Sequence, residues 1–272
     1  MRLISWNVAS LRARLPRVLE LLEELEPDVL CLQETKCSAA QFPRLELEAA
    51  GYRIDEHSAG PWNGVAILSR AATAGDAPSE PLAGLPGQHD PTEARWIEAT
   101  VGGLRIASVY VINGKALDHP DYRAKLAFLD AMAERARTLA AGGPLVIMGD
   151  MNVCPTDRDC YAPDRFVAGT HTSEPERTAL RGVLEAGDLV DGFVAVNGED
   201  FPADDPKGPG GPRYTWWDYR AGNFHKNLGL RIDLALLDRE TAARAERVWV
   251  SREFRKGQKP SDHAPLVVDL AD

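Results

Sequence analysis

Short apolar runs bordered by polar residues recur along the chain and predict a series of buried β-strands. The clearest runs lie at residues 2–6, 29–32, 145–148, 230–237 and 264–270. Weaker runs that we also expect to be strands lie near residues 52–57, 64–69, 95–101, 104–112 and 246–250. Trp62-Asn63-Gly64 and Gly102-Gly103 supply turns between neighbouring runs. Strands therefore outnumber helices, and hairpin spacings mix with longer crossovers.

Amphipathic segments between these runs predict the helices. We expect them to begin near Pro16, to cover about residues 39–50, to cover residues 118–140, and to run from the capping box Ser173-Glu174-Pro175-Glu176 to about residue 186. Pro16 is expected in the first turn of its helix. Residues 70–94 and 198–213 are rich in glycine and proline and are expected to be loops. We interpret residues 1–272 as one α+β domain in which two sheets pack together with helices outside.

Carboxylate, amide and imidazole side chains stand at the ends of four apolar runs and within a fifth, the run at residues 230–237 that contains Asp233. These residues are Asn7, Glu34, Asp150 with Asn152, Asp233, and Asp262 with His263. Taken singly, each has a structural explanation, such as an Asx turn at Asp150 or a salt bridge between Asp233 and Arg231. Charged groups are seldom buried unpaired, however, and sheet-based enzymes place their chemistry where strand ends meet. Five such positions together predict one functional site.

The residue types at these positions suit phosphoester hydrolysis. Glu34, with Asn7 and Asp262, offers the hard oxygen ligands that bind Mg²⁺ or Mn²⁺. His263 needs an acid partner to fix its ring, and Asp233 is a better candidate than Asp262, because adjacent side chains on a strand point to opposite sides. A metal ion stabilises charge on a phosphoryl group while the dyad and a nearby acid position water.

Composition and charge limit the class of protein. The chain has 44% hydrophobic residues, no apolar run long enough to span a membrane and no signal peptide, so we expect a cytoplasmic protein without a membrane partner. Four scattered cysteines predict reduced thiols. The net charge of −10 argues against a nucleic-acid partner when taken alone, although clustered acids would suit a divalent cation. HExxH, GxSxG and GxxxxGK[ST] motifs are absent from the sequence.

Nine segments, in order along the chain, resemble exonuclease III-type apurinic/apyrimidinic endonucleases of the endonuclease–exonuclease–phosphatase superfamily. They are Ser5-Trp6-Asn7-Val8, Leu32-Gln33-Glu34-Thr35-Lys36, Trp62-Asn63-Gly64-Val65-Ala66, Glu93-Ala94-Arg95-Trp96, Tyr110-Val111-Ile112-Asn113-Gly114, Gly149-Asp150-Met151-Asn152, Thr215-Trp216-Trp217-Asp218-Tyr219-Arg220, Leu230-Arg231-Ile232-Asp233 and Pro260-Ser261-Asp262-His263. The first, second, sixth and ninth segments, with their Asn, Glu, Asp-x-Asn and Ser-Asp-His elements, mark only the superfamily. The fifth and seventh are more specific for its DNA-repair branch.

The resemblance implies a four-layer α/β/β/α sandwich of two packed mixed sheets flanked by helices. It also implies Mg²⁺-dependent cleavage of duplex DNA 5′ of abasic sites, with 3′–5′ exonuclease and 3′-phosphatase activity, by a monomer associated with the nucleoid. The expected partner is double-stranded DNA with abasic sites or 3′ ends. Two departures, Ala9 in place of a small polar residue and Ile112 in place of proline, concern the strength of DNA binding.

The resemblance also implies residue roles. Metal ligation is assigned to Glu34, Asn7 and Asp262, contact with the scissile phosphate to Tyr110 and to His263 held by Asp233, and proton handling to Asp150 oriented by Asn152. Asn113 and Trp216 are expected at the pocket for a base-less sugar, which is cheap to flip out of a duplex. Arg95 and Lys115 are expected phosphate contacts.

Two other functions stay open on the sequence alone. The first is a superfamily phosphoesterase acting on a small-molecule or lipid phosphate, for which the Trp216-Trp217 segment would be packing. The second is a protein that binds damaged DNA without cutting it. We expect at least one of Trp216 and Trp217 in the core, and Trp62 and Trp96 as packing residues.

Overall fold

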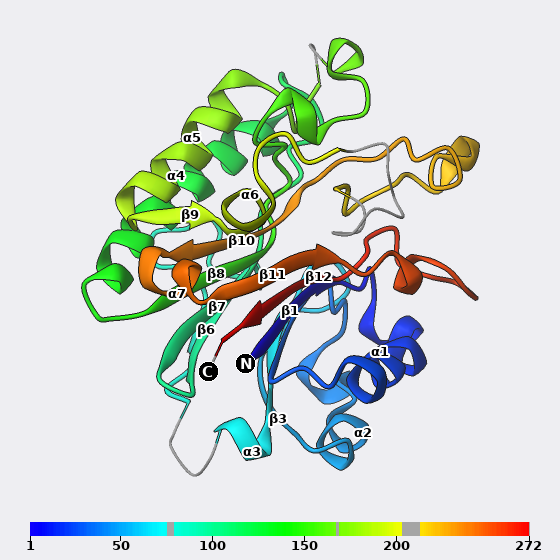
Figure 1. The fold of residues 1–272 in the computed structure, drawn as a ribbon, viewed down its shortest axis with the longest axis vertical. Coiled ribbons are helices and arrows are strands. Elements are labelled where there is room, and N and C mark those ends of the chain that lie inside the picture. The colour runs from blue at the N-terminus through cyan, green and yellow to red at the C-terminus, as the bar shows by residue number, and fades with distance from the viewer. Residues whose placement is uncertain (75–78, 167–168, 203–212, 272) are drawn as a thin grey trace.

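Two packed sheets form the centre of the molecule, as the computed structural model shows for residues 1–74, 79–166, 169–202 and 213–271 (Figure 1). Over these residues each sheet has six strands. The first sheet has the order β11 (Ala245–Val250), β12 (Leu266–Leu270), β1 (Arg2–Asn7), β2 (Val29–Gln33), β4 (Val65–Arg70), β3 (Tyr52–His57). The second has the order β5 (Leu82–Ala83), β6 (Trp96–Val101), β7 (Leu104–Tyr110), β8 (Leu145–Asp150), β10 (Asp233–Asp238), β9 (Leu189–Asp191).

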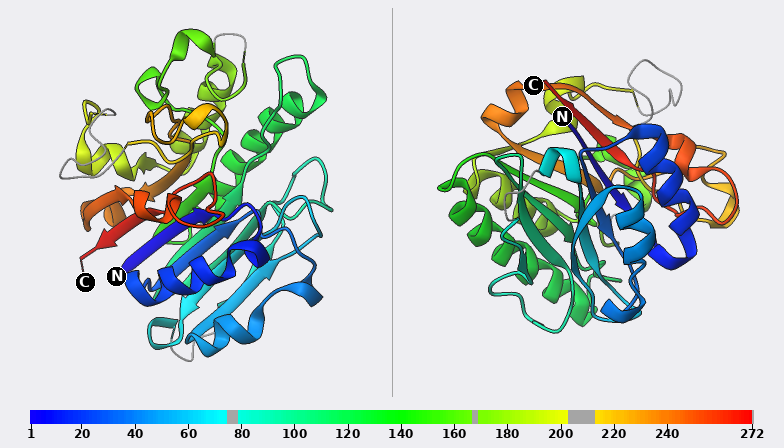
Figure 2. Two further views of the ribbon diagram at one scale, coloured as in Figure 1. Left: turned by 90° about the vertical axis from the view of Figure 1, so that its right-hand side faces the viewer. Right: turned by 90° about the horizontal axis from the view of Figure 1, so that it is seen from below.

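Helices cover the outer faces of both sheets. They are α1 (Leu11–Leu25) and α2 (Arg44–Ala49) on the first sheet, and α4 (Pro120–Ala140) and α5 (Glu174–Ala186) on the second. The shorter helices α3 (Ala71–Ala74), α6 (Gly192–Asn197) and α7 (Arg239–Ala243) pack against the central cluster between the sheets. In the right-hand view of Figure 2 the blue helices lie on one side of the strands and the green helices on the other. The predicted four-layer α/β/β/α sandwich is therefore confirmed. Among the described residues no helix combines the length and the apolar character needed to cross a membrane.

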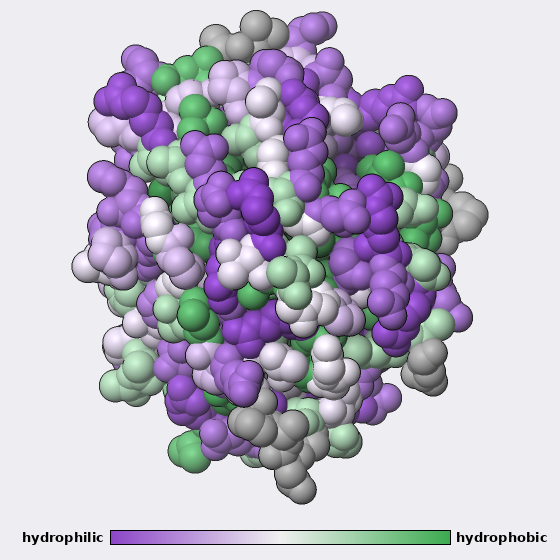
Figure 3. All heavy atoms as spheres, turned by 90° about the vertical axis from the view of Figure 1, so that its left-hand side faces the viewer, coloured by the Kyte–Doolittle hydropathy of each residue, from purple (hydrophilic) through white to green (hydrophobic). Residues whose placement is uncertain are grey.

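Three layers of apolar side chains hold the four layers together. The central cluster joins the two sheets through residues such as Ile67 and Val146. A second cluster lies under α4 and α5 and includes Phe128 and Leu180, and a third lies under α1 and includes Leu21. The face of the molecule shown in Figure 3 is mostly hydrophilic with scattered hydrophobic residues, as expected for helices that bury only one side.

Strand pairing brings the polar strand ends together. β1 runs parallel to β2 and β7 parallel to β8, while the other pairs are antiparallel, so both sheets are mixed as predicted. In this register Asp150 at the end of β8 lies opposite both Tyr110 of β7 and Asp233 of β10. Gly149 precedes Asp150 at φ +153°, where a Cβ atom would lie 2.0 Å from the Val109 carbonyl oxygen, so only glycine fits there.

Two helix boundaries differ from those expected. The helix α1 begins at Leu11, so Pro16 lies inside it and not in its first turn. The backbone amides of Ser10 and Leu11 donate to the carbonyls of Glu34 and Thr35, and these contacts fix the start of α1 early. The helix expected over residues 39–50 is a 3₁₀ turn followed by the shorter α2, separated at Pro43. The loop expected over residues 198–213 lies largely outside the described residues.

Candidate active site

His263 and Asp233 form the orienting pair that the sequence predicted. His263 Nδ1 lies 2.8 Å from Asp233 Oδ2, and both side chains are buried. Asp262, the sequence neighbour of His263, instead accepts a hydrogen bond from Trp216 Nε1 at 3.0 Å. The prediction that Asp233 and not Asp262 holds His263 is confirmed. The other ring nitrogen of His263, Nε2, lies 3.8 Å from Asp150 Oδ2.

The Trp216 segment fixes His263 beside β10. Thr215 Oγ1 accepts hydrogen bonds from the backbone amides of Ile232 and Asp233, and the Ala264 amide donates to the Thr215 carbonyl. The segment therefore ties the start of β10 to the chain around His263. The fully buried Trp217 packs in the central core, and its side chain confirms that one of the paired tryptophans is a core residue.

Electrostatics within the pair keep His263 charged. Burial alone lowers the pKa of His263, but the carboxylates of Asp233 and Asp150 raise it to about 10. Burial raises the pKa of Asp150 to about 7; the charge of His263 opposes this rise, and the charges of Asp233 and Glu34 add to it. An imidazolium thus faces a carboxylate that titrates near neutral pH. This is an arrangement for stabilising negative charge and transferring a proton.

Glu34, Asp150 and His263 form a cluster in which one potential ligand atom from each lies within 4.8 Å of the others. Asn7 joins the two acids, because its Nδ2 donates to Glu34 Oε1 at 2.8 Å and to Asp150 Oδ2 at 2.9 Å. Lys36 Nζ forms an ion pair with Glu34. Converging carboxylate oxygens supply the donor set that hard divalent cations prefer, so these residues fit a metal ion of the Mg²⁺ or Mn²⁺ type.

The loop that carries Glu34 packs closely on the turn at residues 62–64. The amides of Thr35 and Lys36 donate to the carbonyls of Gly64 and Asn63. Gly64 has φ +115°, and a Cβ atom there would lie 2.1 Å from Thr35 Oγ1, so the contact requires glycine. Since the backbone at residues 63–64 faces the Glu34 loop, Trp62 is left 80% exposed at the tip. The expectation that Trp62 is a packing residue was therefore wrong, whereas Trp96 is fully buried as expected.

Asn113 and Asn152, predicted for sugar binding and for orientation, contact each other. Asn113 Nδ2 donates to Asn152 Oδ1 at 3.2 Å, and Asn152 Nδ2 donates to the Val111 carbonyl at 2.9 Å. The Asn152 amide donates to Asp150 Oδ1 at 2.9 Å and so orients that carboxylate. Tyr110 lies in the same region, where burial and the charges of Glu34 and Asp150 raise the pKa of its hydroxyl far above the usual value.

His171 completes this group and was missed by sequence reasoning. Its Nε2 lies 3.1 Å from Asn152 Oδ1 and 3.3 Å from Asn113 Nδ2. Burial and the Lys125 cation lower the pKa of His171 to about 3, so its ring is neutral at physiological pH. His171 stands in a loop two residues before the capping box, not at the end of an apolar run, so the strand-end pattern gave no signal for it.

The predicted phosphate contacts are cations already paired with acids. Arg95 Nε lies 2.8 Å from Glu93 Oε2, and its guanidinium stacks 4.8 Å over the Tyr110 ring. Lys115 Nζ lies 2.7 Å from Asp121 Oδ2. Both therefore stay predicted contacts, and a phosphate would have to compete with a neighbouring carboxylate for each of them.

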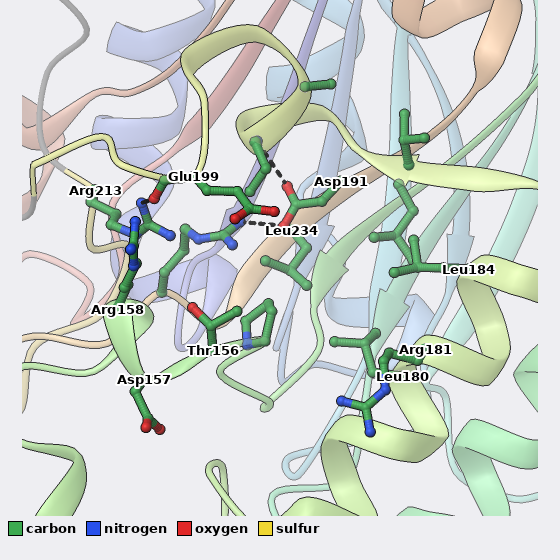
Figure 4. Close-up of a pocket in the computed structure, with 16 residues that line it drawn as sticks. Thr156, Asp157, Arg158, Leu180, Arg181, Leu184, Asp191, Glu199, Arg213 and Leu234 are labelled. Atoms are coloured by element: carbon green, nitrogen blue, oxygen red, sulfur yellow. Dashed lines mark hydrogen bonds and ion pairs between the residues drawn. The ribbon is translucent and has the colours of Figure 1, made fainter.

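A cavity of about 660 Å³ lies apart from these residues, between α5, α6 and β10. Figure 4 shows its apolar side at Leu180, Leu184 and Leu234 and its polar side at Asp191 and Arg213. Arg231 also lines the cavity, and its side chain pairs with Asp159 and Asp191. No predicted site residue lines this cavity. The sequence allowed a second explanation for Asp233, a salt bridge with Arg231. In the described residues Arg231 pairs with Asp159 and Asp191 instead.

Comparison with known proteins defines the class. The sequence pattern of the Endonuclease/Exonuclease/phosphatase family matches residues 4–263, so the chain belongs to this family. It is 31% identical to exodeoxyribonuclease III of Haemophilus influenzae over 98% of each chain. Two solved structures of the Neisseria protein NExo, described as a 3′ phosphatase bound to product DNA hairpin and as a 3′–5′ exonuclease, share 37% and 38% identity and a TM-score of 0.90 with this chain over the full length of each chain.

A third solved structure, an AP endonuclease from Archaeoglobus fulgidus, shares 30% identity and a TM-score of 0.89 over the full length of both chains. The chain is therefore a phosphodiester hydrolase of the exonuclease III and AP endonuclease type. Its resemblance to that group, inferred from sequence segments, is confirmed.

Proposed function

We propose that this chain is a Mg²⁺-dependent DNA-repair phosphoesterase that acts on 3′ ends and 5′ of abasic sites in duplex DNA. The observation that carries the proposal is the buried dyad of His263 and Asp233 facing Asp150 beside the carboxylate of Glu34. Similarity to NExo, a 3′ phosphatase and 3′–5′ exonuclease, gives 3′-end hydrolysis the stronger support, because the two NExo structures have higher identity to this chain than the AP endonuclease has.

The assigned roles come from the family resemblance, and the geometry of Glu34, Asp150 and His263 supports them. Glu34 would hold Mg²⁺, with Asn7 and Asp262 close to it, and the ion would neutralise charge on the phosphoryl oxygens. The charged His263 donates from Nε2 to a phosphate oxygen. Asp150 accepts the proton of the attacking water, which its pKa of about 7 allows near neutral pH.

The remaining polar residues bind and orient the substrate. The Tyr110 hydroxyl stays protonated and donates to the phosphate, because its pKa is raised far above the usual value. Asn152 orients Asp150 through its backbone amide. The exposed Asn113 and the half-buried Trp216 contact the sugar at the site of cleavage. Similarity to the AP endonuclease from Archaeoglobus fulgidus supports cleavage at abasic sites as the second activity.

Three duplexes that differ only at the cleavage position would test the proposal. One has a 3′-phosphate, one a 3′-hydroxyl and one an internal tetrahydrofuran abasic analogue, and each is incubated with Mg²⁺, Mn²⁺ or a chelator. We expect metal-dependent release of phosphate from the first duplex, slower shortening of the second and incision of the third. The proposal is wrong if none is cleaved in either metal. Glu34→Ala and His263→Ala should each lower turnover by at least ~10²-fold.

The same experiment separates the other candidate functions. Tight binding of the abasic duplex without cleavage in either metal would identify a damaged-DNA binder. Hydrolysis of inositol or sphingolipid phosphates with no DNA cleavage would identify a small-molecule or lipid phosphoesterase. We further propose that the protein acts as a monomer on nucleoid DNA in the cytoplasm, and size-exclusion chromatography with light scattering would test its oligomeric state.

A further inference from the structure

A buried ion pair joins Lys125 of α4 to Glu176 of α5 beneath the two asparagines of the proposed site. Both side chains have no exposed surface, and Lys125 Nζ contacts Glu176 Oε1. Such a pair is costly to bury unless hydrogen bonds satisfy both charges. The groups that form hydrogen bonds with Lys125 and Glu176 therefore indicate the structural role of this ion pair.

The ammonium of Lys125 holds the backbone at both asparagines. Its Nζ donates to the Asn152 carbonyl at 2.6 Å, to the Asn113 carbonyl at 3.3 Å and to Thr170 Oγ1 at 3.1 Å. Thr170 Oγ1 itself lies 2.8 Å from the Asn113 carbonyl. One cation thus joins the segment after β7, the segment after β8 and the segment before α5.

The carboxylate of Glu176 holds the segment that carries His171. Its Oε1 accepts hydrogen bonds from Thr170 Oγ1 at 2.7 Å and from the His171 amide at 2.9 Å. Its Oε2 accepts from the Ser173 amide and hydroxyl, at 3.1 and 2.6 Å, in the capping box. Glu176 of the capping box predicted from sequence therefore has two roles: it caps α5, and it is the buried anion that pairs with Lys125.

The contacts leave little room for the three segments to shift. Gly114 has φ +90°, and a Cβ atom there would lie 2.8 Å from Thr170 Oγ1 and 3.2 Å from Lys125 Cδ. Asn152 adopts φ +51°, in the left-handed region that few residues other than glycine and asparagine adopt. The hydrogen bond from Lys125 to its carbonyl helps to hold this conformation, and the Asn152 amide in turn orients Asp150.

We propose that the Lys125–Glu176 pair is a positioning device that sets the distance between Asn113 and Asn152 and aims Asp150 through Asn152. The pair contacts no substrate, and its effect on catalysis passes through these three residues. The inference rests on the proposed function, because it uses the roles assigned there to the asparagines and Asp150.

An apolar replacement of the whole pair removes its contacts without leaving a single buried charge. Lys125→Met combined with Glu176→Met leaves the carbonyls of Asn113 and Asn152 and the amide of His171 without these partners, so we expect a lower melting temperature. Turnover is therefore measured at a temperature where circular dichroism shows the variant to be folded. We expect kcat on the 3′-phosphate duplex at saturating DNA to fall roughly 10- to 100-fold, as for small displacements of catalytic groups. Wild-type kcat in this folded variant would overturn the proposal.

Glu98 provides the matched control. It is a fully buried acid that pairs with Arg105 and with Arg135, which also lies on α4, and it contacts none of the assigned site residues. Glu98→Gln should lower the melting temperature and leave kcat unchanged at a temperature where the variant is folded. If kcat falls equally in this control, a general loss of rigidity explains the effect and the positioning role is refuted.

Two further measurements cover the other outcomes. If the double methionine variant does not fold, Thr170→Val decides, because it removes only the hydroxyl shared by Lys125, Glu176 and the Asn113 carbonyl; wild-type kcat in that variant would refute the role. Hydrogen exchange in residues 113–115, 151–153 and 170–172 reports the positioning without any activity, so it remains informative if the wild type cleaves no DNA. We expect faster exchange in these residues in both variants. Unchanged exchange would refute the proposal.

Discussion

Replacing Asp233 by asparagine tests whether the charge on His263 is needed at the site. The substitution keeps the size of the side chain and an oxygen able to accept from His263 Nδ1, which lies 2.8 Å from Asp233 Oδ2 in the wild type. It removes the carboxylate that is the main influence raising the pKa of His263. Asp150 remains near His263 Nε2 at 3.8 Å, so the ring keeps one acidic neighbour.

The size of the effect follows from the pKa of the ring. In the wild type a pKa of about 10 keeps His263 charged at pH 8.5, and at about 1.4 kcal/mol per pKa unit the environment favours the charged form by several kcal/mol. In Asp233→Asn burial still lowers the pKa of His263 while the charge of Asp150 still raises it, so we expect the pKa to fall toward its usual value of 6.5. At a pKa of 6.5 only about 1 in 100 rings would be charged at pH 8.5, so kcat should fall by up to ~10²-fold.

Two assays measure this shift. Turnover of the 3′-phosphate duplex is followed from pH 6 to pH 10 with Mg²⁺, and His263 is titrated by NMR in metal-free protein with labelled histidine. We expect the wild-type ring to stay charged up to about pH 9, and the variant to lose activity more steeply as the pH rises. The reasoning is refuted if the wild-type ring titrates near pH 6.5, or if the two profiles of turnover against pH are parallel.

Three further substitutions test other parts of the site. A carboxyl group with a raised pKa contributes stability at low pH that is lost as the pH rises through that pKa, which is about 7 for Asp150. Asp150→Asn should therefore abolish turnover yet raise the melting temperature of metal-free protein at pH 8.5, with a smaller gain at pH 5; an equal melting temperature at pH 8.5 would contradict this. Asp121→Asn frees Lys115 and should steepen the salt dependence of DNA binding by about one unit of slope, whereas an unchanged slope would show that Lys115 makes no phosphate contact. Trp62→Ala should raise KM for duplex DNA several-fold with little change in kcat, because exposed aromatic rings stack on bases, and Leu45→Ala, a residue equally exposed at 80%, should leave KM unchanged.

The sequence predicted the positions of site residues correctly where these positions depend only on the geometry of paired strands. Asp150 was expected at the end of its strand and ends β8, whereas Asp233, expected inside a strand over residues 230–237, begins β10; the two lie opposite each other because β8 and β10 pair in register. The choice of Asp233 over Asp262 as the partner of His263 needed only the alternation of side chains along a strand. The polar residues that strand pairing brings together in the site were therefore predictable from the apolar runs and the residues beside them.

Residues that act through long-range contacts between helices and loops could not be predicted in this way. Lys125 lies within a helix where an amphipathic pattern places charged residues on the solvent side, yet it is fully buried. Its partner Glu176 was recognised as a capping residue, but nothing local indicated a buried cation beneath it. The opposite error was made for Trp62. It was expected to be buried, as large aromatic residues usually are, but it is exposed at the tip of a turn.

The acidic character of the chain also has a different meaning in the folded protein. The net charge of −10 argued against a nucleic-acid partner, but some of this charge lies in carboxylates directed into the site, such as Glu34 and Asp150. Cations near the site, including Arg95 and Lys115, are paired with acids close to them in the sequence. A phosphate that binds one of these cations must replace its carboxylate partner, so the net gain in attraction is small. A divalent ion among the carboxylates would change this balance, because it would turn a group of acids that repels phosphate into a site that attracts it. On this reasoning we expect DNA affinity to depend on metal binding, so the overall charge does not predict the partner.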